Sequence, residues 1–128
     1  MRDAINTLLA LETWAIVGLS DNPTRAAWDV SKFLQDRGKR IIPIHPSAPI
    51  VHGVKGFASL DEVPFPVEVV DCFVRSDLVG PVVDQAISNG ASGVWMQLGV
   101  VDEAAATWAT VAGLTVVMDR CPRIEWRD

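Results

Sequence analysis

Short apolar runs alternate with amphipathic stretches along the chain, and this alternation constrains the fold more than any other feature. The mostly apolar runs cover residues 14–17, 40–44, 67–74, 93–96 and 114–118. The stretches with helical spacing cover residues 3–11, 22–37, 76–88 and 102–112. Apolar runs without polar alternation are typical of parallel strands that are buried on both faces. We therefore predict an α/β fold with a single doubly wound, mostly parallel sheet of about five strands.

Capping residues mark the ends of two of the predicted helices. Asn22-Pro23 predicts an N-cap followed by proline at the first helical position. Arg37-Gly38 predicts the end of the same helix, because it places a cation in the last turn and glycine just after it. Asp102 predicts the start of the alanine-rich helix near the end of the chain.

Turn and breaker residues fill the rest of the chain. Pro43 favours an edge position for its strand, since proline has no N–H to donate. Residues 47–58 are predicted to form a loop, and an irregular tail is predicted from Cys121-Pro122 onward. We find no internal repeat, linker or low-complexity segment. A length of 128 residues suits one hydrophobic core, so residues 1–128 are predicted to form a single domain.

Composition argues against several classes of function. The net charge is −5 and no run of basic residues is present, so binding of nucleic acid is not expected. No apolar run approaches the roughly 20 residues of a membrane span, and the first residues do not resemble a signal peptide. Two cysteines are too few for a disulfide framework. We therefore expect a cytoplasmic protein, and a small anionic ligand fits this balance because a few local donors suffice to hold it.

Ligands of open α/β sheets bind just beyond the carboxyl ends of the strands. The side chains and turns at those positions are therefore the candidate binding residues. They are Gly18, Leu19, Ser20, Arg25, His45, Pro46, Phe73, Val74, Arg75, Gln97, Gly99 and Cys121.

The first of these loops has the chemistry of a phosphate site. Gly18 allows a tight turn, Ser20 offers a hydroxyl group, and Arg25 adds a full charge. The predicted helix start near residues 22–24 aims free N–H groups and a positive dipole end into the same space. The alternative is an ordinary strand-to-helix turn, which many α/β proteins have.

The loop and the second strand end disfavour NAD. A dinucleotide fingerprint holds three glycines, whereas this loop holds Gly18 alone. An NAD site places an acidic residue after the second strand to bind the ribose, and this chain has His45-Pro46 there. Imidazole can donate a hydrogen bond to phosphate, so a ligand with a phosphate on its ribose is not disfavoured. On these residues alone, a surface loop histidine is the preferred interpretation of His45.

Three further residues have two interpretations each. Arg75 can bind phosphate or carboxylate with its planar guanidinium group, or pair with Asp77 at the surface. Asp71 lies within an apolar strand, and we interpret it as a carboxylate that caps a neighbouring loop. Cys121 lies between Arg120 and Arg123, and positive neighbours favour the reactive thiolate, but a packed or ligand-adjacent thiol is the preferred interpretation.

The chain resembles the small stand-alone CoA-binding proteins of Rossmann-type fold. That family is related to the N-terminal CoA-binding domain of the succinyl-CoA synthetase α subunit. The resemblance runs from about Trp14 to Trp126. It rests on five blocks in order: AIVGLSDNPTR, RIIPIHP, VDCFVRS, GVWMQLGVVDEAAATWA and VVMDRCPRIEW.

The resemblance implies that CoA lies across the strand ends. It places Gly18-Leu19-Ser20 and Arg25 near the phosphates and Ile44-His45-Pro46 at the adenosine end. It places Phe73-Val74-Arg75 and Gln97-Leu98-Gly99 along the pantetheine arm. This sequence departs from the family at His45, where members more usually carry asparagine. The phosphoryl-carrying histidine of the synthetase lies in a second domain, so the resemblance does not imply ligase activity.

The leading hypothesis is therefore a non-catalytic module that binds CoA or acyl-CoA as a carrier, sensor or partner of another protein. The first alternative is an enzyme that uses Cys121 for acyl or disulfide exchange. The second is an NAD(P)-binding redox sensor, since such sensors share the fold. We predict no metal site, because His45 and His52 lack metal-ligand spacing with either cysteine. A homodimer or an unknown protein partner is compatible with the sequence.

Overall fold

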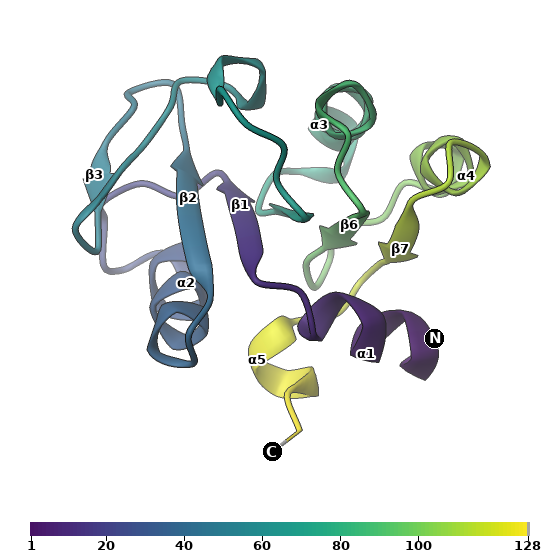
Figure 1. Cartoon of the computed structure of the whole chain (residues 1–128), viewed down its shortest axis with the longest axis horizontal. Helices are drawn as coiled ribbons and strands as arrows, with labels where there is room; N and C mark the ends of the chain where they lie inside the picture. The colour runs from purple at the N-terminus through teal and green to yellow at the C-terminus, as the bar shows by residue number, and fades with distance from the viewer. Residues whose placement is uncertain (128) are drawn as a thin grey trace.

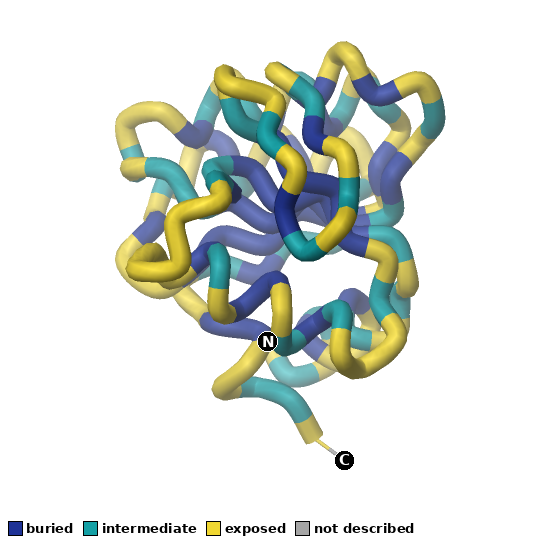
Figure 2. Tube along the Cα trace, turned by 90° about the vertical axis from the view of Figure 1, so that its left-hand side faces the viewer, coloured by how far each residue is buried: buried dark blue, intermediate teal, exposed yellow. Residues whose placement is uncertain are grey.

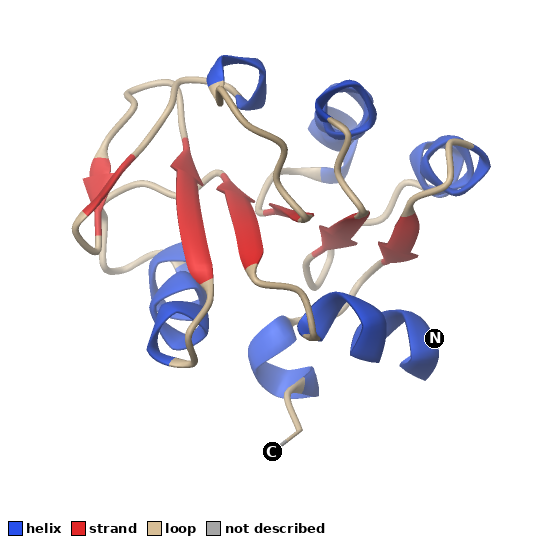
Figure 3. Ribbon diagram, in the orientation of Figure 1, coloured by secondary structure: helices blue, strands red, loops and turns tan. Residues whose placement is uncertain are grey.

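Five strands form one parallel sheet in the computed structural model, which describes residues 1–127 (Figures 1 and 3). In chain order they are β1 (Thr13–Val17), β2 (Arg40–Ile44), β5 (Val69–Cys72), β6 (Gly93–Met96) and β7 (Thr115–Val117). The helices are α1 (Arg2–Leu9), α2 (Ala26–Asp36), α3 (Val79–Asn89), α4 (Glu103–Val111) and α5 (Pro122–Glu125). Two 3₁₀ turns, η1 (Leu60–Glu62) and η2 (Ser76–Leu78), and a small hairpin of β3 (Ile50–Val51) and β4 (Val54–Lys55) complete the elements.

The strand order is β2-β1-β5-β6-β7, with every neighbouring pair parallel. The chain therefore builds outward from β1 in one direction and then returns to β5 to build in the other. The carboxyl ends of β1 and β5 flank this reversal, and open α/β sheets bind their ligands at such a point. The predicted doubly wound sheet of about five strands is confirmed.

Helices cover both faces of the sheet, so the strands are buried on both sides (Figures 1 and 2). On one face α3 and α4 cover a core around Val70, Val94 and Met96. On the other face α1, α2 and the residues around α5 cover a core around Trp14 and Trp95. This double burial explains why the strands are continuous apolar runs rather than alternating ones.

The local signals for two helices and one strand are confirmed. Asp102 caps α4, because its carboxylate accepts a hydrogen bond from the Ala105 N–H at 3.0 Å. Gly38 follows α2 with a φ of +89°. Pro43 lies in β2, which is an edge strand of the sheet. Within residues 1–127 no helix has both the length and the apolar character needed to cross a bilayer.

Three local predictions are wrong. The second helix begins at Ala26, not at Asn22, because the Asn22 side chain accepts hydrogen bonds from Thr24 within a preceding turn. The expected loop over residues 47–58 contains the β3–β4 hairpin, whose two turn residues both have positive φ, as a type I′ turn requires. The tail after Cys121 forms the short helix α5, which begins with proline at its first turn.

Candidate ligand-binding site

A pocket of about 520 Å³ opens at the carboxyl ends of the strands. Its walls come from the loops after β1, β2, β5 and β6 and from the first turn of α2. The lining residues are Gly18, Ser20, Arg25, Ala26, Ala27, His45, Phe73, Val74, Arg75, Leu78, Gln97, Leu98 and Val100. We call it the strand-end pocket. Eight of these thirteen residues are among the twelve predicted from the sequence.

Gly18 is required by the packing of the strand ends. It has a φ of +97°, and a Cβ atom there would lie 2.3 Å from the carbonyl oxygen of Phe73. Its N–H donates to the Ile44 carbonyl at 2.8 Å, so it ties the end of β1 to the end of β2. The glycine therefore serves contact between neighbouring strand ends, whereas the sequence suggests close approach to a ligand.

The start of α2 gives the pocket its donors for an anion. Arg25 is the N-cap residue, and its side chain makes no capping hydrogen bond. Ala26 and Ala27 line the pocket in the first turn, where backbone N–H groups have no acceptor within the helix. The positive end of the helix dipole and the Arg25 charge act in the same place. The late start of α2 thus brings its N–H groups to the pocket itself.

His45 lies at the edge strand side of the pocket and has a defined tautomer. The Ser47 backbone N–H donates to His45 Nδ1 at 3.2 Å. A nitrogen that accepts a hydrogen bond carries no proton, so the neutral ring holds its proton on Nε2. The Ser47 hydroxyl also lies 2.9 Å from Nδ1 and can donate to it. His45 therefore has an Nε2–H donor that is not used in these contacts.

Arg75 lines the pocket and also pairs with Asp77, so both of its predicted interpretations apply to one side chain. Its Nε lies 3.1 Å from one carboxylate oxygen and its Nη2 lies 2.7 Å from the other. The hydrogen bonds from Arg75 lower the pKa of the Asp77 carboxyl, and Asp77 in turn raises the pKa of the guanidinium group. Both side chains are largely exposed, so water and salt screen this pair strongly.

Hydrogen bonds to side chains hold the loop after β6 in place. The Gly99 N–H donates to the Asp119 carboxylate at 2.7 Å. The Ser76 hydroxyl donates to the Gly99 carbonyl at 3.1 Å and accepts from the Val101 N–H at 2.9 Å. Gln97, at the start of this loop, is 6% exposed, and its Oε1 has no hydrogen-bond partner in the described chain. The loop is fixed, and it presents one buried amide group to the pocket.

Four residues predicted for the site do not line the pocket. Leu19 is fully buried among apolar side chains, and Pro46 is exposed beyond the end of β2. Gly99 is exposed and lies in the chain between Leu98 and Val100, which do line the pocket. Cys121 is 8% exposed and packs into the apolar core that contains Trp95. Sequence reasoning marks the strand ends and cannot tell which way each side chain points.

The two arginines beside Cys121 contact other parts of the chain, Arg123 through its side chain and Arg120 through its backbone. Arg123 forms an ion pair with Asp29 on α2. The Arg120 carbonyl accepts a hydrogen bond from the Trp95 indole N–H at 2.8 Å. The structure thus places Cys121 in a packed position, in agreement with the preferred interpretation of the sequence.

Four pocket residues are not among the strand-end positions predicted from the sequence: Ala26, Ala27, Leu78 and Val100. Leu98 also lines the pocket, and it belongs to the segment that the family resemblance places along the pantetheine arm. The two alanines enter through the late start of α2. Leu78 lies in η2, and its side chain is 52% exposed. Leu98 is 55% exposed, so the mouth of the pocket carries two exposed leucines. An apolar residue inside a polar loop is the only signal for Leu78 in the sequence.

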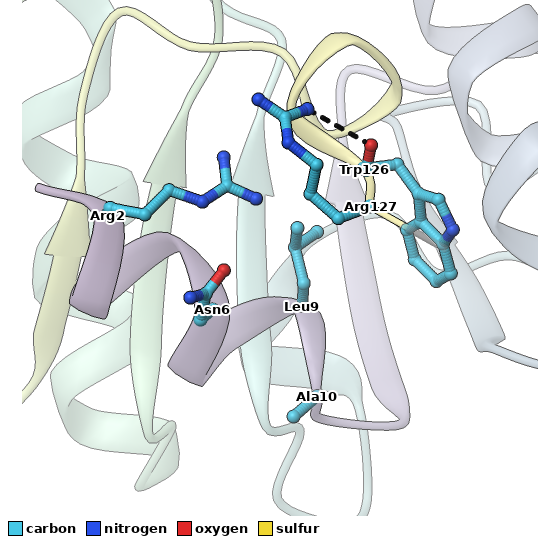
Figure 4. Close-up of a pocket in the computed structure, with 6 residues that line it drawn as sticks. All are labelled: Arg2, Asn6, Leu9, Ala10, Trp126 and Arg127. Carbon is cyan, nitrogen blue, oxygen red and sulfur yellow. Dashed lines mark hydrogen bonds between the residues drawn. The ribbon is translucent and has the colours of Figure 1, made fainter.

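A second hollow of about 220 Å³ lies between α1 and the C-terminal segment (Figure 4). Arg2 and Arg127 extend toward it from these two segments, with Asn6 and Leu9 beside them. Arg2 bonds to the side chain and the carbonyl of Glu125, at 3.2 and 2.8 Å. None of the predicted site residues lines this hollow, which marks a contact between the two ends of the described chain.

Fold and pocket together define a doubly wound α/β domain with a pocket at its topological switch point. The sequence profile of a CoA binding domain family matches residues 12–127. The chain belongs to this family. The resemblance inferred from the sequence blocks is confirmed.

Relatives of the chain include a bacterial protein and two proteins of known structure. The uncharacterized protein YneT of Bacillus subtilis (strain 168) is 39% identical over 110 residues, which cover 86% of this chain and 82% of YneT. The structure of a hypothetical protein from Pyrococcus horikoshii OT3 matches with a TM-score of 0.91 and 36% identity, covering 98% of this chain and 89% of that one. A dinucleotide-forming acetyl-coenzyme A synthetase of Ca. Korarchaeum cryptofilum shares the fold, with a TM-score of 0.73 and 23% identity over 83% of this chain and 26% of the synthetase.

Proposed function

We propose that the protein binds coenzyme A or an acyl-CoA in the strand-end pocket, as a carrier, sensor or partner module without chemistry of its own. The observation that carries the proposal is the position of the pocket. It lies at the topological switch point of a chain that belongs to a CoA binding domain family.

The chemistry of the pocket changes from one end to the other in a way that suits this ligand. At one end, Arg25, the first N–H groups of α2 and the His45 Nε2–H are donors for phosphate oxygens. At the other end, Leu78, Leu98 and Val100 provide apolar surface. CoA combines a phosphorylated nucleotide with an uncharged amide-containing arm. The pocket residues therefore fit both halves of the ligand.

The acidic balance of the chain does not oppose this assignment. The net charge is −5, but Arg25, Arg75 and the positive end of α2 meet at one pocket. Local donors within a few ångströms outweigh distant charges, which salt screens over about 10 Å. Anion binding by this site is consequently compatible with an acidic protein.

Calorimetric titration with CoA and thermal unfolding in its presence test the proposal. Ligand at a hundredfold excess over its Kd adds about 2.7 kcal/mol to the free energy of unfolding, so the Tm rises with the logarithm of CoA concentration. Arg25→Ala lowers the CoA affinity because a phosphate donor is lost. Arg37→Ala is the matched control, since Arg37 ends the same helix on the side away from the pocket.

Two outcomes contradict the proposal. If neither CoA nor acetyl-CoA at millimolar concentration shifts the Tm or gives heat of binding, the protein does not bind this ligand. If Arg25→Ala and Arg37→Ala weaken binding equally, CoA binds outside the strand-end pocket. NADH titrated in parallel distinguishes CoA binding from binding of nicotinamide dinucleotides.

A further inference from the structure

Asp71 and Gln97 hold all of the enclosed side-chain nitrogen and oxygen atoms that lack a hydrogen-bond partner within residues 1–127. These atoms are both carboxyl oxygens of Asp71 and Oε1 of Gln97. Asp71 is 0% exposed, and the sequence interpretation makes it the cap of a neighbouring loop. That interpretation is wrong, because its carboxyl group bonds to no loop in the described chain. Unpartnered buried polar atoms are rare in native proteins, so their concentration on two residues points to a role other than packing.

The sheet places the two residues on the same face of neighbouring strands. Asp71 in β5 lies opposite Trp95 in β6, and Gln97 follows two residues later. The Gln97 N–H donates to the Cys72 carbonyl at 3.4 Å, so the pairing continues one step past the end of β6. Side chains alternate along strands, and Trp95 belongs to the core on the α2 side. Asp71 and Gln97 are therefore diagonal neighbours. With neighbouring strands about 4.8 Å apart and a rise of about 3.3 Å per residue, their Cα atoms lie about 8 Å apart, within reach of a glutamine side chain.

The environment of Asp71 favours the neutral form of its carboxyl group. Complete burial raises the pKa of its carboxyl well above the usual value, and no charge partner opposes this effect. No ion pair within residues 1–127 includes Asp71. A protonated carboxyl group has an O–H donor, which an ionised one lacks. The neighbouring Gln97 Oε1 is an acceptor without a partner.

Gln97 connects this buried region with the pocket. It lines the strand-end pocket although only 6% of its surface is exposed. Its Oε1 is enclosed, whereas its Nε2 is not among the enclosed unpartnered atoms and forms no hydrogen bond in the described chain. The amide nitrogen is accordingly the end that solvent or a ligand reaches. Without a donor at Oε1, nothing fixes which end of the amide group faces the pocket.

We propose that Asp71 is a positioning residue: its neutral carboxyl group donates a hydrogen bond to Gln97 Oε1 when ligand is bound, and so directs the Gln97 N–H groups toward a carbonyl oxygen of the uncharged arm of the ligand. The inference rests on the proposed function and deepens it. The amide carbonyls of a pantetheine-type arm are the ligand groups that this arrangement recognises. The nucleotide half of the ligand does not depend on it.

Two ligands and four variants test this proposal by calorimetry. The ligands are CoA and adenosine 3′,5′-bisphosphate, a nucleotide that has no amide arm. Asp71→Leu and Gln97→Met each weaken CoA binding roughly three- to tenfold, the usual effect of one neutral hydrogen bond, and leave the bisphosphate affinity unchanged. Asp71→Asn retains CoA affinity within about twofold, because its amide N–H replaces the carboxyl donor. In the double variant, which combines Asp71→Leu with Gln97→Met, the loss is no larger than in Gln97→Met alone.

Infrared difference spectra provide an independent measurement. Addition of CoA to the wild-type protein shifts the C=O stretching band of a protonated carboxylic acid to lower frequency, and Asp71→Asn lacks both the band and its shift. This readout needs no apolar substitution, so it holds even where Asp71→Leu fails to fold. A role in folding alone would not produce a shift that depends on CoA.

Different results overturn different conclusions. If the wild-type protein binds CoA and Asp71→Leu binds it equally well, the positioning role is refuted while the proposed function stands. If Asp71→Leu weakens CoA and the bisphosphate by the same factor, the effect is structural and the positioning role is refuted. If the wild-type protein binds neither ligand, the proposed function itself fails.

Discussion

Replacing Asp71 by asparagine changes the pH dependence of stability in a way that the structure defines. Asp71 lies fully buried in the middle of the sheet, and this burial raises the pKa of its carboxyl well above the ordinary range. In the unfolded chain the same group has a pKa of about 3.9. Asparagine has nearly the same shape and does not titrate, so it is a matched reference for the charge alone.

The sign of the effect follows from proton binding. Between the unfolded and the folded pKa, the native protein keeps the proton of Asp71 while the unfolded chain has lost it. The native state then binds more protons, so its stability falls as the pH rises. The difference in free energy of unfolding between wild type and Asp71→Asn changes by about 1.4 kcal/mol per pH unit, to the disadvantage of wild type. The change begins near pH 4 and ends at the folded pKa.

Urea unfolding of both proteins, followed by tryptophan fluorescence at several values between about pH 5 and pH 8, measures this slope. Other titrating groups contribute equally to both proteins, so they cancel in the difference. A difference that stays constant over this range means that Asp71 has the same charge in the folded and unfolded states. That result would refute the neutral acid, and with it the hydrogen bond that we assign to Gln97.

Three further perturbations have defined outcomes. Gly18→Ala lowers the free energy of unfolding by roughly 2–5 kcal/mol, since its Cβ would lie 2.3 Å from a backbone oxygen at a φ of +97°. Gly38→Ala has a φ of +89° and nothing within 4 Å of its Cβ, so it costs only about 1 kcal/mol. Chemical denaturation measures both variants, and equal losses would contradict the packing argument. Cys121 reacts with iodoacetamide much more slowly in the native protein than in urea, because it is 8% exposed, and equal rates by mass spectrometry would favour the thiol enzyme. Asp77→Asn frees Arg75 from its ion pair and tightens CoA binding at low salt, an effect that fades as salt is added; calorimetry at two ionic strengths detects it, and no change would place Arg75 outside the contact with ligand.

The strands and their sheet are predictable because double burial leaves a direct trace in the sequence. Residues 93–96 are apolar without alternation, and β6 occupies the same span. The Asp102 cap is likewise predictable, because the cap and its acceptor bond lie within one helical turn. A structural feature can be predicted from the sequence where its physical cause lies within a few residues, or where the cause repeats along a helix or strand.

The start of α2 could not be predicted, because the same residue pattern serves two structures. Asn22 followed by Pro23 suits a helix N-terminus, yet the Asn22 side chain bonds to Thr24 in a turn that ends before the helix begins. The β3–β4 hairpin escapes prediction for a different reason. Its strands have two residues each, which is too short for any periodic signal.

The pocket is predictable as a place, though its wall is only partly predictable. The positions of the strand-end loops can be predicted from the alternation of strands and helices. The contact between Gly18 and Phe73 depends on the order of the strands in the sheet, which the sequence does not state. Arg25 and Gln97 are expected from the sequence and line the pocket. Leu78 escapes prediction because an exposed apolar side chain carries no periodic signal.

The arrangement separates the recognition of two kinds of ligand group. Phosphate oxygens would meet exposed charges and helix N–H groups around Arg25, where salt and water weaken every contact. An uncharged arm would meet Gln97, whose partner Asp71 is fully buried and neutral, so salt leaves that contact almost unchanged. The loss of CoA affinity in Gln97→Met relative to the wild type should therefore stay constant as the ionic strength rises, although salt weakens the binding of CoA to both proteins. A loss that changes with salt would show that charge contributes to recognition of the arm, which a neutral Asp71 does not permit.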